Sequence, residues 1–244
     1  MTNEMTTLIQ QHRSIRKFTA EPISNQVIDD IVTSGQWAPS SHHVQAYSIV
    51  VVKNQESKNK LAELTGNQSY VAECPVFFVI CADFYRLKQA SDKHKMPFEI
   101  NEVENVLVGA VDAALVAQNM LLAARSYGLG GVMIGGIRNN PDQVAEQLEL
   151  PELVIPIMGL CVGYPDQQPE QKPRFSKNAV VHEERYSFNE ADLERYDEIT
   201  KAYYTKRTNG KRTDSWSEMM AKHFSTRKRP HVTTFIKKQG IDLT

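Results

Sequence analysis

The stretch Val106–Ala124 (VLVGAVDAALVAQNMLLAA) determines how the rest of this chain can fold. It is apolar almost all round, and it predicts one long helix from about 101 to 127 that ends at Gly128. A helix of this kind is buried on most sides, and its alanines and Gly109 allow close contact with another helix, as in a dimer core. Polar residues interrupt it too often for a membrane span, at Asp112, Gln118, Asn119 and Arg125.

Apolar runs on both sides of this helix predict a buried sheet. Tyr47–Lys53 and Pro75–Asp83 are rich in β-branched and aromatic residues. Gly130–Gly136 is a short strand between glycine pairs, and Leu153–Tyr164 is a further strand region. Shorter helices are expected over 3–12, 24–37, 56–65, 86–100 and 141–150. The spacing of strands and helices is not a regular βαβ series. The glycines from Gly128 to Gly131 follow a helix and precede a strand, the reverse of a dinucleotide fingerprint, so a Rossmann domain is not expected.

The composition changes after residue 174. Residues 201–244 hold 11 of the 28 Lys and Arg residues and 3 of the 29 Asp and Glu residues, although the whole chain carries a net charge of -1. This basic end is compatible with nucleic acid, an anionic small ligand or an acidic partner surface. Helices are expected near 190–205 and 215–225. We therefore divide the chain into a core, 1–174, and an extension, 175–244, that is too poor in apolar residues to fold alone and wraps over the core or a partner subunit.

The three cysteines and the N-terminus indicate a cytoplasmic protein. Cys74, Cys81 and Cys161 have no C-x-x-C spacing, and two of them lie in strand-like runs, which is typical of buried structural thiols. The first residues hold no apolar run long enough for a signal peptide, and no stretch of the chain is long and apolar enough to span a bilayer.

Three cationic motifs are candidates for anion binding. His12–Lys17 (HRSIRK) places three cations and a hydroxyl in six residues, Lys172-Pro173-Arg174 forms a second group, and Tyr203–Arg212 (YYTKRTNGKR) is a third. Arginine forks suit phosphates and carbonyl-bearing rings. Each motif is also compatible with an ordinary solvated surface.

Motifs for conventional catalysis are missing from the sequence. It contains no G-x-S-x-G, Walker loop or H-E-x-x-H motif. His42 and His43 do not predict a metal site, because adjacent histidines point apart and no third ligand has a suitable spacing. A bound cofactor that carries the chemistry would explain these absences.

The motifs together resemble the oxygen-insensitive NADPH nitroreductases and the related NADPH–flavin oxidoreductases. HRSIRKF, the Ser-rich loop ending in Gln45, TGNQSYV, the alanine-rich helix, GLGGVMIGGIRNN, GLCVGYP, KPR and YYTKRTNGKR occur in that order, so the resemblance covers nearly the whole chain. It implies an α+β fold, nitroreductase-like, with a central mixed β-sheet flanked by helices around a long central helix. It also implies an intertwined homodimer that binds one FMN in each of two clefts at the subunit interface.

The resemblance further implies roles for individual residues. It assigns the FMN phosphate and ribityl end to His12, Arg13, Ser14, Lys172 and Arg174. It places Arg16 at the pyrimidine edge of the flavin ring. The remaining FMN-binding residues it implies are Ser40, Ser41, Gln45, Gln68, Ile134, Gly135 and Gly136, with the Gly135 amide near the reactive N5 atom. Arg207 and Arg212 would bind the NADPH phosphates. His42 departs from the family, which often has a small hydroxyl residue there.

The activity implied by the resemblance is a ping-pong transfer of two electrons, as a hydride, from NADPH through FMN to nitroaromatics, quinones or free flavin. One alternative is a dedicated NADPH–flavin reductase that supplies reduced FMN. Another, prompted by the basic C-terminal residues, is a flavin- or nucleic-acid-binding module without turnover. No RNA-reading aromatic motif supports it, so nucleic acid is not expected as a partner, and neither is a membrane.

Overall fold

The computed structural model describes residues 3–243, which form two compact units. The first comprises the residues up to Pro169 together with those from Arg229 onward, and the second is Glu170–Lys228. The last residues of the chain therefore belong structurally to the first unit, and the second unit begins before the expected division at residue 174.

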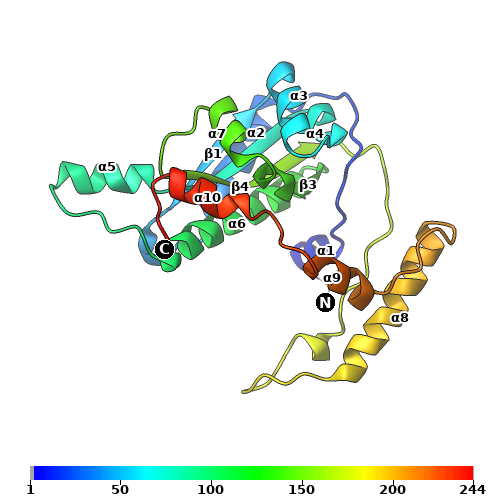
Figure 1. Ribbon diagram of the computed structural model, residues 1–244. Helices are drawn as coiled ribbons and strands as arrows, with labels where there is room; N and C mark the ends of the chain where they lie inside the picture. The colour runs from blue at the N-terminus through cyan, green and yellow to red at the C-terminus, as the bar shows by residue number, and fades with distance from the viewer. Residues whose placement is uncertain (1–2, 244) are drawn as a thin grey trace. The chain divides into compact units, whose positions relative to one another are not determined.

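The first unit is built on a four-stranded sheet in the order β1-β2-β4-β3 (Figure 1). The strands are β1 (Tyr47–Val52), β2 (Val76–Asp83), β3 (Gly130–Ile134) and β4 (Val154–Gly163). All three strand pairs are antiparallel. The expected mixed sheet is corrected in this respect, and the parallel pairing in the described residues is an isolated bridge between Ser14 and Gly131. Apolar runs reveal where strands lie, but strand direction depends on long-range pairing that those runs do not encode.

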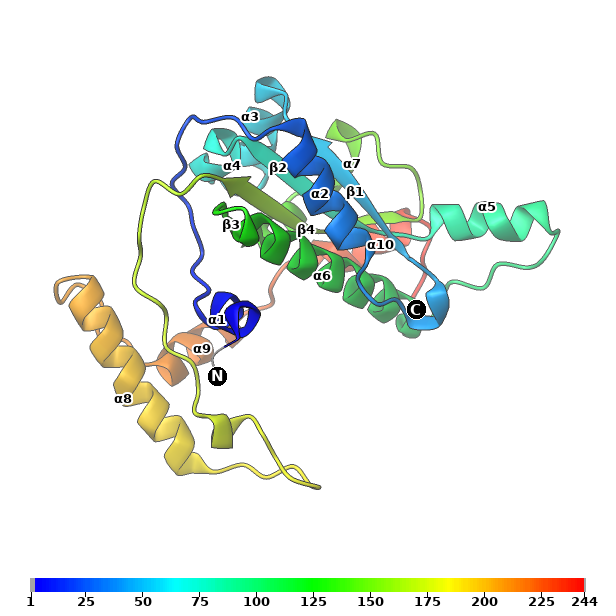
Figure 2. The ribbon, with the colours of Figure 1, turned by 180° about the vertical axis from the view of Figure 1, so that it is seen from behind.

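The central strand β2 is buried on both faces, and its side chains alternate between two parts of the core. Val76, Phe78 and Ile80 pack with α2 (Asn25–Gln36) and α6 (Val103–Ser126). The residues between them face a second cluster built from α3 (Gln55–Leu64), α4 (Ser69–Glu73) and α7 (Pro141–Gln147). Figure 2 shows the sheet from the side of α2 and α6. The strand thus has the continuous apolar character that two covered faces require.

The long helix α6 confirms the prediction made from its sequence. It is long and apolar enough to cross a membrane by length and composition alone. In the fold it is a core helix, with eight buried residues from Gly109 to Ala124 that pack under the sheet. A stripe at four-residue spacing stays exposed on its outer side and consists of Val103, Leu107, Val111 and Leu115.

Strand β4 carries a bulge next to Pro156, on the side that pairs with β2. Ile80 pairs with Met158, but the next residue of β2 pairs with Pro156, so Ile157 is the extra residue. The strand begins at Val154, and Pro156 therefore lies inside it. The proline cannot donate a ladder hydrogen bond, and a bulge is one of the places where a strand tolerates this.

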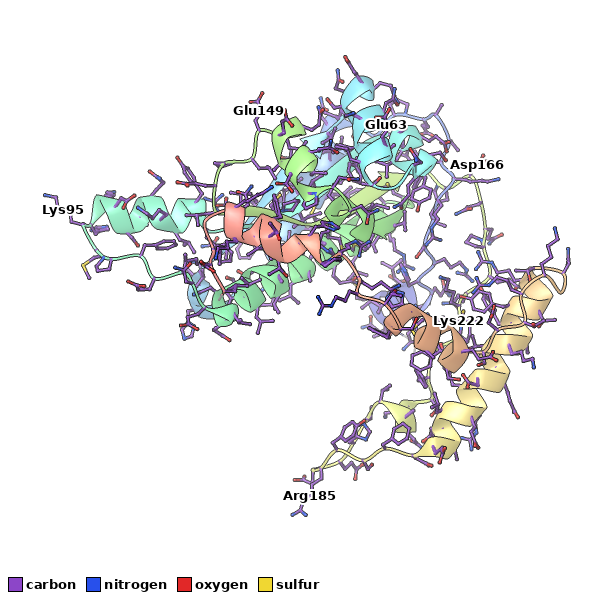
Figure 3. The ribbon with its side chains drawn as sticks, viewed as in Figure 1. Glu63, Lys95, Glu149, Asp166, Arg185 and Lys222 are labelled. Atoms are coloured by element: carbon purple, nitrogen blue, oxygen red, sulfur yellow. The ribbon has the colours of Figure 1, made fainter. Side chains whose placement is uncertain are left out.

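The remaining elements of the first unit are short. Helix α1 (Glu4–Gln10) is capped by Asn3, and α5 (Tyr85–Lys93) extends away from the sheet toward Lys95 (Figure 3). Helix α10 (His231–Lys238) was not predicted, and its Phe235 is buried in a third apolar cluster with Phe84 and Ile241. The 3-10 turns of this unit are η1 (Ser41–His43) and η2 (Gly135–Arg138).

The second unit contains α8 (Glu190–Arg207) and α9 (Trp216–Phe224), close to the helices expected there, and the 3-10 turn η3 (Lys177–Ala179). Phe175, Tyr196 and Trp216 form an aromatic cluster between its segments, with the Phe175 and Tyr196 ring centroids 3.8 Å apart. Lys222 of α9, labelled in Figure 3, pairs with Asp214 at 3.0 Å.

The three cysteines are free and buried, as predicted. Burial raises the pKa of the Cys81 thiol to about 12, with a smaller contribution from the nearby Asp83 carboxylate. Burial likewise raises the pKa of Cys161, which lies beside Cys74. Thiols with raised pKa values are poor nucleophiles, so Cys81 and Cys161 act as core side chains.

Candidate active site

The N-terminal segment that carries His12–Arg16 lies along the edge of the sheet. Ser14 bridges to Gly131 of β3, and the backbone amide of Ile15 donates a 3.0 Å hydrogen bond to the Gly131 carbonyl. A Cβ atom at Gly130 would lie 2.5 Å from the Ile15 side chain, so glycine is needed here for the segment to approach the strand. This pairing fixes the positions from which Arg13 and Arg16 extend.

Arg13 is a partly buried cation whose hydrogen-bonding capacity is incompletely used. Its Nη1 donates to the Gln11 carbonyl at 3.2 Å, but its Nε is buried and has no partner among the described residues. Arg125, in the last turn of α6, lies nearby, and its pKa is lowered by burial and then by the charge of Arg13. Two arginines in close proximity with an unused donor form a site suited to an anion. Arg125 was not predicted as part of the site.

The turn after β3 brings Gly135 and Gly136 to the helix α3–α4 junction. A Cβ at Gly136 would lie 2.4 Å from both the Thr65 carbonyl oxygen and Gln68 Nε2. Gln68 Nε2 donates to that same carbonyl at 2.6 Å, and its Oε1 accepts from Tyr70. At Gly135 a Cβ would meet only Arg138, at 3.5 Å. Gly136 therefore packs tightly against the end of α3, whereas Gly135 has space around its Cα atom. Ile134, just before them, is buried in the core.

The Ser-rich loop is held by a buried carboxylate of α6. The Ser40 hydroxyl donates to Asp112 Oδ2 at 2.8 Å and accepts from the Gln45 amide at 2.7 Å. The same carboxylate oxygen accepts from the Ala46 amide at 3.0 Å, and Asp112 is only 2% exposed. Ser40 is therefore a structural anchor in this chain, whereas Ser41 is exposed. The sequence argument used Asp112 only against a membrane span, although an isolated acidic residue inside an apolar helix is a signal that could have pointed to this network.

The residues that follow Ser41 adopt a strained backbone. His42, His43 and Gln45 all have left-handed φ values, of 48°, 58° and 51°. Such conformations are uncommon outside glycine and often occur at functional sites. The His43 and Gln45 side chains lie 3.2 Å apart, between Nε2 atoms.

The predicted FMN residues of the first unit fall into two groups within one chain. The first includes Arg13, beside Arg125, and the second includes Ser40, bound to Asp112. Thirteen residues of α6 separate Arg125 from Asp112, which corresponds to about 20 Å along the helix axis. Ser14 pairs with β3, and Gln68 lies against Gly136. The Ser40 loop is instead attached to α6, through Asp112.

Two further arginines near Gly135 were missed by the sequence analysis. Arg138 donates to the carbonyl of Ile157, the bulge residue of β4, and its pKa is lowered by burial and then by the charge of Arg229. Arg229 Nε donates to Asn139 Oδ1 at 2.8 Å. Neither arginine pairs with a carboxylate among residues 3–243. Their proximity depends on the return of the chain to the first unit, which no local pattern reveals.

The other predicted binding residues belong to the second unit. Arg174 Nη1 bonds the carbonyls of Lys172 and Pro173, at 3.3 and 3.2 Å. Arg207 Nη1 donates to the Tyr203 hydroxyl at 2.7 Å, and the Arg212 guanidinium lies 4.2 Å from the centroid of the Tyr204 ring. Both arginines are exposed at the end of α8 and in the loop after it. No group of His, Cys, Asp and Glu side chains suited to a metal is found in the part of the chain that the structure describes.

Comparisons with known proteins match this chain over almost its full length. The profile of the Nitroreductase family matches residues 9–164, and that of the Nitroreductase family C-terminal domain matches residues 172–244. The chain is 42% identical over 245 residues to an FMN reductase [NAD(P)H] of Bacillus subtilis, with 98% of each chain covered. It is 42% identical over 242 residues to an NADPH-flavin oxidoreductase of Vibrio harveyi, with 99% of each covered.

A solved structure agrees with these sequence relatives. The structure of NfrA2 from B. megaterium superimposes with a TM-score of 0.97 at 40% identity, covering 100% of both chains. The family matches span both structural units, and the fold agrees throughout. The chain belongs to the Nitroreductase family.

Proposed function

We propose that this protein is an FMN-dependent NADPH oxidoreductase that reduces nitroaromatics, quinones or free flavin. The observation that carries the proposal is that the Nε atom of Arg13 is buried without a partner among the described residues, close to Arg125. The segment that holds Arg13 pairs with β3, and β3 leads into the turn at Gly135. This arrangement offers an anion site and an accessible backbone on connected elements. Its relatives include an FMN reductase and an NADPH-flavin oxidoreductase.

The residues present fit FMN. Arg13, with His12 and Ser14, would hold the phosphate, and the charge of Arg125 would strengthen that attraction. Lys172 and Arg174, which the resemblance also assigns to the phosphate, belong to the second unit. Arg16 would lie at the pyrimidine edge of the ring, where a positive charge stabilises the negative charge that develops on reduction. Gly135 would present its amide to the ring, because the residue is only partly buried and a Cβ there would meet no atom closer than Arg138 Nη2, at 3.5 Å.

Bound FMN would supply the redox chemistry, taking two electrons from NADPH and passing them to the acceptor. The protein's own residues hold the two substrates in turn against one face and exclude water. The side chains of Gln45, Gln68 and Ser41 can donate or accept hydrogen bonds to polar ring edges. The Arg138 and Arg229 charges would favour acceptors near Gly135 that carry negative charge or develop it on reduction. The proposal includes a cytoplasmic location, which suits three free thiols.

A homodimer accounts for the two groups of predicted FMN residues. Because the Ser40 group lies about 20 Å along α6 from the Arg13 group, a second copy that supplies one of the two groups would bring both to one flavin. The exposed stripe of α6, from Val103 to Leu115, offers an apolar face for that copy and is lined on one side by Pro39 and Ser41. In this dimer the exposed Ser41, on the loop that Ser40 anchors to Asp112, would serve the FMN held by the partner's Arg13.

The proposed NADPH site predicts a specific loss. We expect Arg207→Ala to raise KM for NADPH about tenfold, because a charge-assisted phosphate contact contributes about 1.5 kcal/mol or more. Steady-state kinetics with NADPH and with NADH measure this, and KM for NADH should change little because NADH lacks the 2′-phosphate. Lys201→Ala, which removes an exposed charge from the same helix, is the control and should leave both constants unchanged. An unchanged KM for NADPH in Arg207→Ala contradicts the phosphate role.

The acceptor is tested by comparing turnover with free FMN and with a nitroaromatic under NADPH. A broad oxidoreductase reduces both at comparable rates, whereas a dedicated flavin reductase strongly prefers FMN. A binding module without turnover reduces neither, and salt-dependent retention on nucleic acid would then favour that reading.

A further inference from the structure

We propose that Tyr203 and Tyr204 are positioning residues that orient Arg207 and Arg212 toward the 2′-phosphate of NADPH. They would thereby set the preference for NADPH over NADH. This inference rests on the proposed NADPH-binding role of the two arginines, and all the residues in it belong to the second unit.

Each arginine is held by a tyrosine in a different way. Arg207 lies one helical turn after Tyr203 on α8, and its Nη1 donates to the Tyr203 hydroxyl at 2.7 Å. Arg212 comes from the loop after α8, and its guanidinium lies 4.2 Å from the centroid of the Tyr204 ring. The two rings themselves contact edge to face, with centroids 5.1 Å apart and planes at 74°. The hydroxyl is thus the orienting group at Tyr203, and the ring face is the orienting group at Tyr204.

The loop backbone supports this arrangement. The Thr208 hydroxyl donates to the Tyr204 carbonyl at 2.7 Å and accepts from the Arg212 amide at 2.8 Å. The Gly210 amide bonds the Thr205 carbonyl at 2.8 Å, and Gly210 has a left-handed φ of 80° that suits the turn. These bonds return the chain so that Arg212 lies over the ring of Tyr204. The arginines are therefore ordered before any ligand is bound, which lowers the entropic cost of binding.

Tyrosine orients a guanidinium without neutralising it. Neighbouring lysines of this unit have close carboxylate partners, at 2.8 Å for Lys206 with Glu170 and at 3.0 Å for Lys222 with Asp214. Arg207 forms no such pair among the described residues, and Arg212 reaches Asp214 only at 4.0 Å. The charge of Asp214 is engaged more closely by Lys222, whose pKa it raises. Both arginines thus keep their positive charge available for a phosphate.

The test exploits the difference between the hydroxyl and the ring. Calorimetry on the full-length, FMN-loaded protein would measure affinity for adenosine 2′,5′-bisphosphate, with adenosine 5′-monophosphate as the ligand that lacks the 2′-phosphate. We expect Tyr203→Phe to weaken bisphosphate binding about threefold, because it removes the hydrogen-bond acceptor. We expect Tyr204→Leu to weaken it about threefold, whereas Tyr204→Phe, which keeps the ring, should retain the wild-type affinity. The monophosphate affinity should stay constant in all three.

Several outcomes would overturn the inference. One is wild-type bisphosphate affinity in both Tyr203→Phe and Tyr204→Leu. Another is an equal loss for Tyr204→Phe and Tyr204→Leu, since the ring would then have no special role. A matching loss of monophosphate affinity would indicate general damage to the unit. If Arg207→Ala also leaves the bisphosphate affinity unchanged, the proposed NADPH site itself is wrong. If only Arg207→Ala weakens binding, that site stands and the tyrosine roles are wrong.

Discussion

Replacing Gly136 with alanine should lower the free energy of unfolding by about 3 kcal/mol and prevent stable retention of FMN. The new Cβ would lie 2.4 Å from the Thr65 carbonyl oxygen and from Gln68 Nε2. The oxygen belongs to the backbone at the end of α3 and already accepts from Gln68 and from Asn139, at 2.6 and 3.0 Å. Because the clash falls on backbone, no side-chain movement relieves it. The turn must move instead, and it carries Gly135 with it.

Gly135→Ala is the matched control for this substitution. Its Cβ would meet only Arg138 Nη2, at 3.5 Å, which is ordinary contact distance. We expect its unfolding free energy to stay within about 0.5 kcal/mol of wild type. Urea unfolding monitored by circular dichroism measures both variants, and the flavin content of the purified proteins measures FMN retention. Equal stability of the two alanine variants would contradict the packing described for the turn.

Asp112→Ala should destabilise the protein by about 3 kcal/mol and disorder the Ser40 loop. The substitution removes the acceptor for the Ser40 hydroxyl and for the buried Ala46 amide, at 2.8 and 3.0 Å. A buried donor left without a partner costs about 1–3 kcal/mol, and the deleted carboxylate also leaves a cavity. Asp112→Asn keeps one acceptor oxygen and the side-chain shape, so it should lose about half as much.

The control for the Asp112 substitutions is Asp92→Ala on α5. Asp92 forms an exposed pair with Lys88, and such pairs contribute little to stability, about 0–1 kcal/mol. Urea unfolding compares the variants, and proteolysis near residues 41–45 reports on the loop. If Asp112→Ala is no more destabilising than Asp92→Ala, the buried carboxylate does not hold the loop.

Local sequence patterns predicted the elements of the fold well. The long apolar run forms α6, and the other four apolar runs form the four strands. These runs were recognisable because a strand that is buried on both faces consists almost entirely of apolar residues. Ser24, the first residue of the helix expected over 24–37, caps α2, with its hydroxyl accepting from the Val27 amide. The direction of the strands was not predicted correctly, since pairing between distant segments leaves no such pattern in the sequence. Helix α10 was not predicted. It buries a single residue, Phe235, so its sequence carries only a weak apolar pattern.

The candidate site was predictable where a motif carried its own chemistry. The cations of His12–Lys17 and the glycines at 135 and 136 stand out in the sequence, whereas Arg125 and Arg138 acquire meaning only through neighbours distant in the chain. Ser40 shows the opposite case. The sequence offered its hydroxyl to the ligand, but Asp112 and the Gln45 amide already use it. Hydrogen-bond partners so far apart in sequence cannot be derived from composition or spacing.

The measurement that tests the proposed function most directly is the visible absorption spectrum of the purified protein, before and after NADPH is added without air. We predict a yellow flavin spectrum that bleaches on addition of NADPH, which would establish the cofactor and the electron donor together. A protein that stays colourless after FMN is supplied would contradict the FMN site built around Arg13 and the turn at Gly135.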